Sequence, residues 1–264
     1  MWVRLCPRSA RAGKVPVTRQ KAEEEWIEGA RPVLEALRAG RRKLLEVWIP
    51  RQARSAAQRE LLERVEACGL KRHEVELARE IRARARPLPE SSLEDLLIAL
   101  PAPRYLVALD GVTDVGNLGS IARSAETAGV QGLVLELRNS PPMSAAALRV
   151  SSGALEHLAV ARTPNLGRAL DLAIQEGMKV LAADLGGDPL SDLTAEEASG
   201  DLLWVFGSED HGIRSGVLRR AQRRLAIPVR GRVESLGVAA AAAVMLHHTA
   251  TLRMASRNPG DETR

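Results

Sequence analysis

Residues 105–125 read YLVALDGVTDVGNLGSIARSA, an apolar run followed by a glycine-containing loop and an alanine-rich segment. The apolar run predicts a buried strand at 105–109, and the alanine-rich segment predicts a helix over 118–128. This order recurs as far as the C-terminus. It predicts further strands at 133–137, 179–183, 202–206 and 225–227 and further helices at 144–153, 166–176, 217–224 and 236–254. Such alternation predicts an α/β fold whose mainly parallel sheet has helices on both faces.

The segment before residue 105 has a shorter alternating pattern, which predicts a small α/β domain. Pro32 suits the first turn of a short helix, residues 44–49 read as a strand, and residues 55–67 read as a helix that ends at Gly69. The proline-rich stretch that follows indicates a linker with a short helix over 92–99. We therefore expect a basic disordered arm at 1–24, a small domain at 25–84, a linker at 85–103, a larger domain at 104–256 and a tail at 257–264.

The charge of the chain points to a polyanionic partner. The formal net charge is +5 and the pI is about 9.7. Residues 1–104 hold 22 Lys and Arg against 15 Asp and Glu. Because lysine and arginine displace the counterions of phosphates, an RNA partner would explain this excess of positive charge. A solvated arginine-rich surface without a partner would also explain it. The chain has only four Trp, one Tyr and one Phe, which indicates that RNA would be held by its backbone and shape rather than by stacked bases.

Metal, membrane and secreted proteins are disfavoured. Cys6 and Cys68 are the only cysteines and form no CxxC, so the sequence predicts neither a disulfide framework nor a zinc site, and it favours the cytoplasm. His247 and His248 are adjacent and cannot form an HExxH pair. The apolar run 236–246 is too short to span a bilayer. The basic, acid-free segment 1–22 would suit a mitochondrial transit peptide, but its single Ser and two Pro favour a disordered arm.

The first two loops after predicted strands carry candidate functional residues, because parallel sheets bind ligands at the carboxyl ends of their strands. The loop within 110–125 has Asn117 at an expected helix N-cap and Arg123 about two turns into the helix. It contains neither GxGxxG nor GK[ST], which disfavours a dinucleotide-dependent enzyme. The loop 206–212 reads FGSEDHG, and its glycines allow a ligand to approach the backbone around Glu209. Its acids oppose phosphate and favour a cationic or neutral cofactor.

The third loop leads into the last predicted helix. Residues 227–243 read IPVRGRVESLGVAAAAA, in which Ser235 is a natural N-cap and the alanines allow close helix packing. Taken alone, these candidates also have structural interpretations: a helix cap for Asn117 and Ser235, a solvated helix residue for Arg123, and an acid near a helix start for Glu209.

Together, in this order and spacing, the three loops resemble the three signature motifs of the SpoU (TrmH-like) class of the SPOUT methyltransferase superfamily. The resemblance covers about residues 105–255. The front segment, from Gly29 through Val33 to Leu37, resembles the L30e-like substrate-binding domain that precedes many ribosomal-RNA members. The resemblance implies a homodimer with a deep trefoil knot that transfers a methyl group from S-adenosyl-L-methionine to a ribose 2′-hydroxyl of structured RNA. It favours ribosomal RNA over transfer RNA and implies no metal.

The resemblance also implies roles for individual residues. The catalytic positions match Asn117, Arg123, Glu209 and Ser235. Since guanidinium stays protonated, Arg123 is better suited to hold a phosphate beside the reacting hydroxyl than to act as a base. The expected cofactor-binding residues are Ala182, Ala183, Phe206, Gly207, Gly212, Ile227, Pro228, Leu236 and Val238. The expected RNA contacts are Arg31, Arg41, Arg214, Arg230 and Arg232.

The third motif departs from the family, which reads Ser-Leu-Asn where this chain reads Ser235-Leu236-Gly237. Glycine cannot supply the hydrogen bonds of the asparagine amide, and the loss of one oriented polar group can cost about 10²–10³ in rate. A catalytically impaired RNA-binding protein on the same scaffold is therefore an alternative, as is a transfer-RNA ribose methyltransferase. Seven arginines between residues 214 and 232 could form a phosphate-binding face or a solvated basic helix.

Overall fold

The computed structural model describes residues 24–233 and 235–256, which form two compact units. The N-terminal unit comprises Met1–Pro89 and Met143–His157, and the C-terminal unit comprises Glu90–Pro142 and Leu158–Arg264. The assignment of 143–157 to the N-terminal unit differs from the expected single domain at 104–256. The arm expected at 1–24, apart from Glu24, and the tail expected at 257–264 lie outside the described residues.

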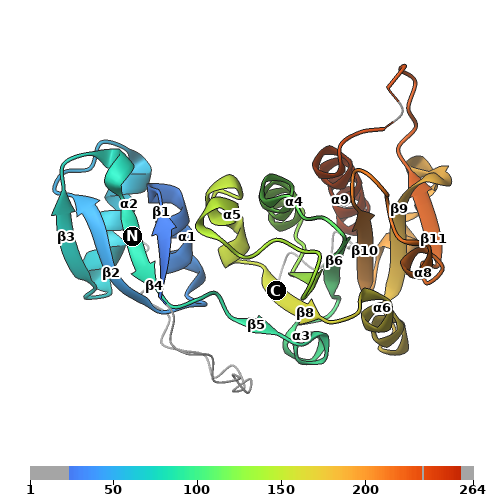
Figure 1. The fold of residues 1–264 in the computed structure, drawn as a ribbon, viewed down its shortest axis with the longest axis horizontal. Helices are drawn as coiled ribbons and strands as arrows, with labels where there is room; N and C mark the ends of the chain where they lie inside the picture. The colour runs from blue at the N-terminus through green and yellow to red at the C-terminus, as the bar shows by residue number, and fades with distance from the viewer. Residues whose placement is uncertain (1–23, 234, 257–264) are drawn as a thin grey trace. The chain divides into compact units, whose positions relative to one another are not determined.

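The N-terminal unit is built on a four-stranded sheet (Figure 1). Its strands lie in the order β1 (Glu25–Glu28), β4 (Arg82–Ala85), β2 (Leu44–Pro50) and β3 (Lys71–Val75). Strand β4 runs antiparallel to both neighbours, and β2 runs parallel to β3. The helices α1 (Ala30–Ala39) and α2 (Ala56–Ala67) were predicted, as was β2. The pattern did not reveal β1, β3 and β4, whose outward positions are largely charged.

A single apolar core joins these helices to one face of the sheet. Ile27, Val47 and Ala83 from the strands are fully buried and pack with Val33 of α1 and Leu61 of α2. Ser55 caps α2 by accepting a hydrogen bond from the backbone N–H of Gln58. The core is small, as expected for a unit of this length.

Residues 143–157 join this unit through a buried ion pair. They form α5 (Ala145–Val150) and the 3-10 turn η2 (Ala154–Glu156), and the side chains of Glu156 and Arg42 are fully buried against each other. Arg42 Nε donates to Glu156 Oε2 at 3.0 Å. Removing Arg42 would leave the buried Glu156 carboxylate without this cation, so the pair ties the segment firmly to the unit.

The C-terminal unit confirms the expected α/β fold with a parallel sheet. All seven strands are parallel. Their order is β11 (Arg223–Ala226), β9 (Lys179–Pro189), β10 (Leu202–Gly207), β6 (Tyr105–Asp110), β7 (Gly132–Glu136), β8 (Ala159–Thr163) and β5 (Glu90–Ser91). Strands β8 and β5 were not predicted, because the apolar runs there are very short and are interrupted by Arg162 and Glu90.

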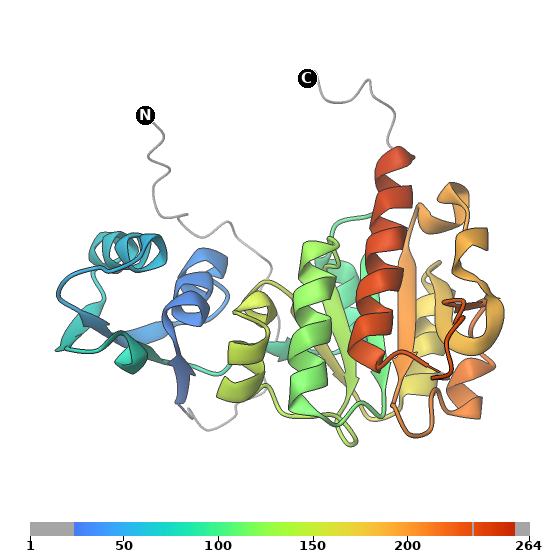
Figure 2. The ribbon, with the colours of Figure 1, turned by 90° about the horizontal axis from the view of Figure 1, so that it is seen from above.

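Helices cover both faces of this sheet (Figures 1 and 2). The helices α4 (Val115–Thr127) and α9 (Val238–Ala255) lie on one face, and α3 (Leu93–Ala99), α6 (Leu166–Gln175) and α8 (Ser215–Leu218) lie on the other. Strand β10 shows how the pleat divides the core. Leu203 and Val205 pack with α3 and α6, whereas Trp204 faces α9 and its Nε1–H donates to Thr249 Oγ1 at 3.1 Å.

The predicted helix at 217–224 is wrong. Helix α8 ends at Leu218, and the chain re-enters the sheet as β11 from Arg223. Three arginines of this segment are bound by carboxylates: Arg220 pairs with Asp171, Arg223 with Asp188 and Glu197, and Arg224 with Asp184. Glu197 lies in the short helix α7 (Ala195–Ala198), far from Arg223 in the sequence. Tertiary ion pairs of this kind cannot be inferred from the local spacing of residues that predicted the helix.

The pairing of β11 with β9 is interrupted once. At the interruption, a short segment of β9 is not paired with β11 and can line a site. Arg224 pairs with Ala182, but the next residue, Leu225, pairs with Asp188. The intervening residues 183–187 leave the ladder. A β-carbon at Gly187 would lie 2.5 Å from the backbone carbon of Arg224, so this close approach requires glycine.

Candidate functional site

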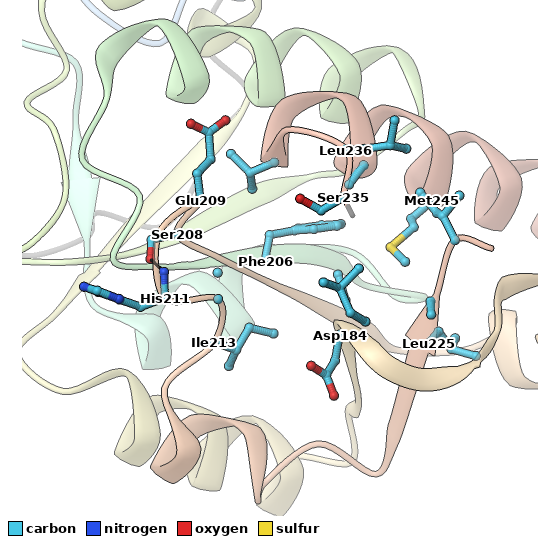
Figure 3. Close-up of a pocket in the computed structure, with 18 of the residues that line it drawn as sticks. Asp184, Phe206, Ser208, Glu209, His211, Ile213, Leu225, Ser235, Leu236 and Met245 are labelled. Carbon is cyan, nitrogen blue, oxygen red and sulfur yellow. Dashed lines mark hydrogen bonds between the residues drawn. The ribbon is translucent and has the colours of Figure 1, made fainter. Parts of the chain in front are cut away.

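A pocket of about 390 Å³ opens where β9, β10 and β11 end and α9 begins (Figure 3). Figure 3 shows Glu209 and His211 at one end, Leu225 and Met245 at the other, and Phe206 and Ser235 between them. Residues from the second and third predicted loops therefore meet in one place, at the carboxyl ends of parallel strands. Met245 lies two turns into α9, and its apolar spacing from Val238 and Ala241 is the sequence signal for a helix face along the pocket.

The loop 207–212 forms one wall of the pocket and folds back on itself. Ser208 N donates to Gly212 O at 3.1 Å, and Gly212 N donates to Ser208 O at 3.0 Å. A β-carbon at Gly207 would lie 2.1 Å from the backbone carbon of Gly212, so no other residue fits there without opening the loop. Gly212 has φ of +63°, which also favours glycine. The glycines predicted to bind the cofactor thus shape the wall itself.

Asp110 and Arg214 anchor the end of this loop to the sheet. Asp110, 1% exposed at the end of β6, accepts from Arg214 N and from Arg214 Nε, both at 2.7 Å. Arg214 Nη2 also donates to Glu136 Oε1 at 2.7 Å. The hydrogen bonds from both carboxylates raise the pKa of Arg214 above its ordinary value. Because Asp110 and Glu136 both bind its guanidinium, the main structural role of Arg214 is to hold the end of the loop in place.

Among the described residues, the lining of the pocket carries acids but neither lysine nor arginine. Asp184, Glu209 and Asp210 contribute carboxylates, while Phe206 and Met245 contribute apolar surface. Phosphate would meet like charge here, whereas a cationic or neutral ligand would not. The pocket therefore has the electrostatic character that the sequence of the second loop indicated.

The start of α9 differs from the prediction in detail. Gly237, not Ser235, is the N-cap, and no side chain in the described part of the chain caps the helix. Ser235 instead lines the pocket. The Glu209 carboxylate lies beside Gly237, since a β-carbon added there would be 3.1 Å from Glu209 Oε1. A carboxylate is therefore next to the positive end of an 18-residue helix.

Asn117 and Arg123 are not brought into this pocket within one chain. The N-cap of α4 is Asp114, whose Oδ1 accepts from Asn117 N at 2.7 Å, so the prediction of Asn117 as the cap is wrong. Arg123 is exposed on the same helix. The first loop nevertheless neighbours the second, since a β-carbon at Gly111 would lie 3.8 Å from Ser208 Cβ.

The other predicted residues divide into those at the pocket and those elsewhere. Seven of the nine expected cofactor-binding residues line it: Ala183, Phe206, Gly207, Gly212, Ile227, Leu236 and Val238. Ala182 is fully buried in β9 and does not line the pocket, and neither does Pro228. Lining residues that sequence reasoning missed include Asp184, Leu185 and Ile213. The segment 183–187 of β9 that leaves the ladder could not be foreseen, because the register of β11 creates it.

Of the expected RNA contacts, Arg31, Arg230 and Arg232 are exposed. Arg41 is partly buried in the N-terminal unit, where it contacts Glu156 O at 3.5 Å and burial lowers its pKa. Among residues 24–233 and 235–256, no group of three His, Cys, Asp or Glu is placed to hold a metal ion. In the same part of the chain, every helix lacks the combination of length and hydropathy that a membrane span requires.

The family model described as "SpoU rRNA Methylase family" matches residues 104–247. The chain belongs to the SpoU rRNA methylase family. A second model, "RNA 2'-O ribose methyltransferase substrate binding", matches residues 26–79. These matches confirm the resemblance inferred from the three loops and from the front segment, and they make the chain an RNA methyltransferase of that family.

Relatives extend this likeness over nearly the whole chain. An "Uncharacterized tRNA/rRNA methyltransferase" of Mycolicibacterium gilvum is 34% identical over 94% of this chain and 84% of its own length. One of Mycobacterium tuberculosis is 32% identical over 96% and 82%, respectively. The solved SpoU methyltransferase AviRb from Streptomyces viridochromogenes is 25% identical, with a TM-score of 0.73 over 89% of this chain and 91% of its own. The same protein was also solved in complex with AdoMet, and that structure matches with a TM-score of 0.71 at 24% identity.

Proposed function

We propose that this SpoU-family protein transfers a methyl group from S-adenosylmethionine to a ribose 2′-hydroxyl of structured RNA, with ribosomal RNA preferred over transfer RNA. The observation that carries the proposal is the pocket at the ends of β9, β10 and β11, walled by the 207–212 loop and lined, among the described residues, by acids without lysine or arginine. The match of residues 26–79 to the substrate-binding model supports the ribose 2′-hydroxyl as the acceptor.

The residues of the pocket fit the cofactor. Its volume suits a ligand of this size, since small-molecule pockets occupy about 300–1,000 Å³. Gly207 allows the 207–212 loop to close tightly and form one wall, and Phe206, Leu236 and Met245 supply apolar surface for an adenine ring. The Glu209 carboxylate places negative charge at the pocket, which favours a ligand with a sulfonium and an ammonium group.

The bound cofactor would supply a methyl group already activated on a positively charged sulfur, so that alignment of the acceptor is the main demand on the protein. Ser235 lines the pocket, and its hydroxyl can accept or donate a hydrogen bond to the ribose. Glu209 holds a carboxylate beside the α9 N-terminus, where it can orient the same hydroxyl. Arg123 is suited to grip the adjacent phosphate as a fixed cation.

We also propose a homodimer, because Arg123 does not reach the pocket of its own chain. Four apolar side chains here are 43–75% exposed: Val229 and Leu236, which line the pocket, Val233 between them in the sequence, and Val244 on α9. A second copy of the chain would cover these side chains and could bring its own Arg123 to the site. The trefoil knot and the role in ribosomal-RNA processing remain expectations of the family resemblance, and the cytoplasmic location remains an expectation from the cysteine content.

The test is calorimetric titration of the purified protein with S-adenosylmethionine, followed by methyl transfer to ribosomal and transfer RNA. Ala241 lines the pocket from α9, so Ala241→Phe should fill the space and abolish binding. Ala56→Phe, at an exposed position at the start of α2, is the matched control and should bind normally. Nuclease digestion of the product should release 2′-O-methylated nucleosides. Base-methylated products, or binding that survives Ala241→Phe, would contradict the proposal.

A second candidate function rests on Gly237. Because this residue lacks the amide of the family's asparagine, the chain could bind RNA and cofactor while transferring methyl groups poorly. Normal cofactor affinity combined with no single-turnover transfer to any RNA would favour this candidate over the enzyme.

A further inference from the structure

The N-terminal sheet has one face that is not part of its core. Ile27, Val47 and Ala83 point into the core against α1 and α2. Because side chains alternate along a strand, the neighbouring Trp26 and Arg82 point to the opposite face. Trp26 is 40% exposed, and Arg82 is also exposed.

Aromatic rings on three strands form a continuous cluster on this outer face. Trp26 of β1 and Trp48 of β2 have ring centroids 4.8 Å apart, tilted by 59°. Trp48 stacks on His73 of β3, with centroids 4.4 Å apart and an angle of 9°. Two of the four tryptophans of the chain thus lie together, and the low overall content of aromatics conceals this concentration.

Arg82 of β4 places a cation against the rings. The Arg82 guanidinium lies 4.6 Å from the Trp26 centroid and 5.5 Å from that of Trp48. Arg82 is exposed and, among the described residues, its side-chain interactions are with the two rings, so its charge remains available to an anion. A guanidinium over a tryptophan ring is attracted by the ring quadrupole, which holds the cation in place while it keeps its charge.

The charge of the same face favours a polyanion. Glu46 is the buried acid there, 6% exposed, and it already pairs with Arg84, Lys71 and His73. Glu24 also lies against Arg84 at 3.1 Å. The acids are therefore occupied by neighbouring cations, and Arg82 together with the exposed Lys71 offers positive charge at the edges of the ring cluster.

We propose that this outer face, defined by Trp26, Trp48, His73 and Arg82, binds an unpaired stretch of the substrate RNA, with a base stacked on Trp26 and a phosphate at Arg82. The proposal rests on the proposed function, in that it assigns the RNA-binding surface of the substrate-binding unit. It combines the two elements of single-strand recognition, a ring that any base can stack on and a nearby guanidinium for the backbone. It also narrows the substrate to an RNA whose loop or bulge exposes an unstacked base.

The test measures the affinity of the full-length protein for a fluorescent twelve-nucleotide uridine RNA and for a twelve-base-pair RNA duplex. Trp26→Ala should weaken binding of the single strand about tenfold, the scale of one lost base–aromatic stack, with a smaller effect on the duplex. Trp26→Phe should restore most of the affinity because a ring remains. Arg82→Gln should weaken binding and reduce its salt dependence by about one phosphate contact.

Arg59→Gln is the matched control, since Arg59 is an exposed arginine on α2, which packs on the core face of the sheet. It should leave single-strand affinity within twofold of the wild type. Because Arg82 is exposed, its variant keeps the test valid if Trp26→Ala fails to fold. Unchanged affinity in both the Trp26 and Arg82 variants would overturn the proposal, as would a wild-type protein that ignores single-stranded RNA and associates with protein through Trp26.

Calorimetry with S-adenosylmethionine on the same samples separates the two proposals. Normal cofactor binding and methyl transfer with no dependence on Trp26 would overturn only the RNA-binding face. Single-strand binding that depends on Trp26, in a protein that binds no cofactor, would overturn only the proposed enzymatic function.

Discussion

The Glu209 carboxylate occupies the space beside Gly237 at the start of α9: a β-carbon on Gly237 would lie 3.1 Å from Glu209 Oε1. Gly237 has φ of −59° and ψ of 150°, a conformation open to every residue, so the backbone does not require glycine here. The contact is with the end of a flexible side chain. A larger residue would therefore displace the Glu209 carboxylate without distorting the chain.

Gly237→Asn should raise the single-turnover rate of methyl transfer by roughly 10²-fold, the scale of one oriented polar group in an active site. The amide would enter the space beside Glu209 and hydrogen-bond the reacting groups. Gly237→Ala supplies the matched control, since it moves Glu209 but brings no amide, and it should give no gain. Quenched-flow measurement at saturating cofactor distinguishes them. Equal rates for the wild type and the asparagine variant would show that Gly237 does not limit this enzyme.

Asp110→Asn should destabilise the C-terminal unit by about 1–3 kcal/mol. Loss of one partner of a buried pair costs about 3–5 kcal/mol, but Arg214 is half exposed and keeps Glu136, so solvent reduces the effect. Cofactor affinity should fall as well, because Arg214 positions the end of the 207–212 loop. Asp171→Asn breaks an exposed pair with Arg220 and should change neither quantity. Urea titration with parallel calorimetry would show both effects, and a stable variant with normal affinity would contradict the role of this clamp.

The sequence predicted most of the site but not its geometry. Alternating apolar runs located β6, β9 and β10, and the order of three loops indicated a cofactor pocket to which Glu209 and Ser235 indeed belong. Composition could not reveal that Arg223 and Arg224 pair with carboxylates in β9 and α7, because those partners lie 26–40 residues away. Those pairs hold β11 in place, in a segment for which the sequence had predicted a helix.

Three further details were not predicted, of which the first and the last depend on tertiary contacts. The pocket wall at 183–187 arises from the stepped pairing of β9 with β11, which has no local signature. The capping of α4 by Asp114 rather than Asn117 is a shift of three residues between two equally good caps. A count of aromatic residues likewise could not show that Trp26 and Trp48 lie 4.8 Å apart.

Glu197 should make the stability of the C-terminal unit sensitive to acid. The backbone N–H of Thr194, followed by the Thr194 hydroxyl and Arg223, holds the pKa of Glu197 below its ordinary value of 4.5. A carboxyl with a lowered folded-state pKa stabilises the fold above the unfolded-state pKa, and this contribution is lost as the pH falls through the folded-state value. Urea midpoints should therefore fall below pH 4.5, and less steeply in Glu197→Gln. Parallel pH profiles for the two proteins would exclude this role.

Gly207→Ala should abolish cofactor binding, because its β-carbon would lie 2.1 Å from the backbone carbon of Gly212 and only movement of the loop could relieve the clash. Loop opening would break the two backbone hydrogen bonds between Ser208 and Gly212 and remove one wall of the pocket. Gly212→Ala is the informative comparison. Nothing lies within 4 Å of its added carbon, and its positive φ of 63° costs only about 1 kcal/mol, so this variant should bind with modestly reduced affinity. Circular dichroism would show whether both variants remain folded, and calorimetry would give their affinities. If Gly207→Ala bound the cofactor as well as Gly212→Ala does, the tight loop would not form the wall of the binding site.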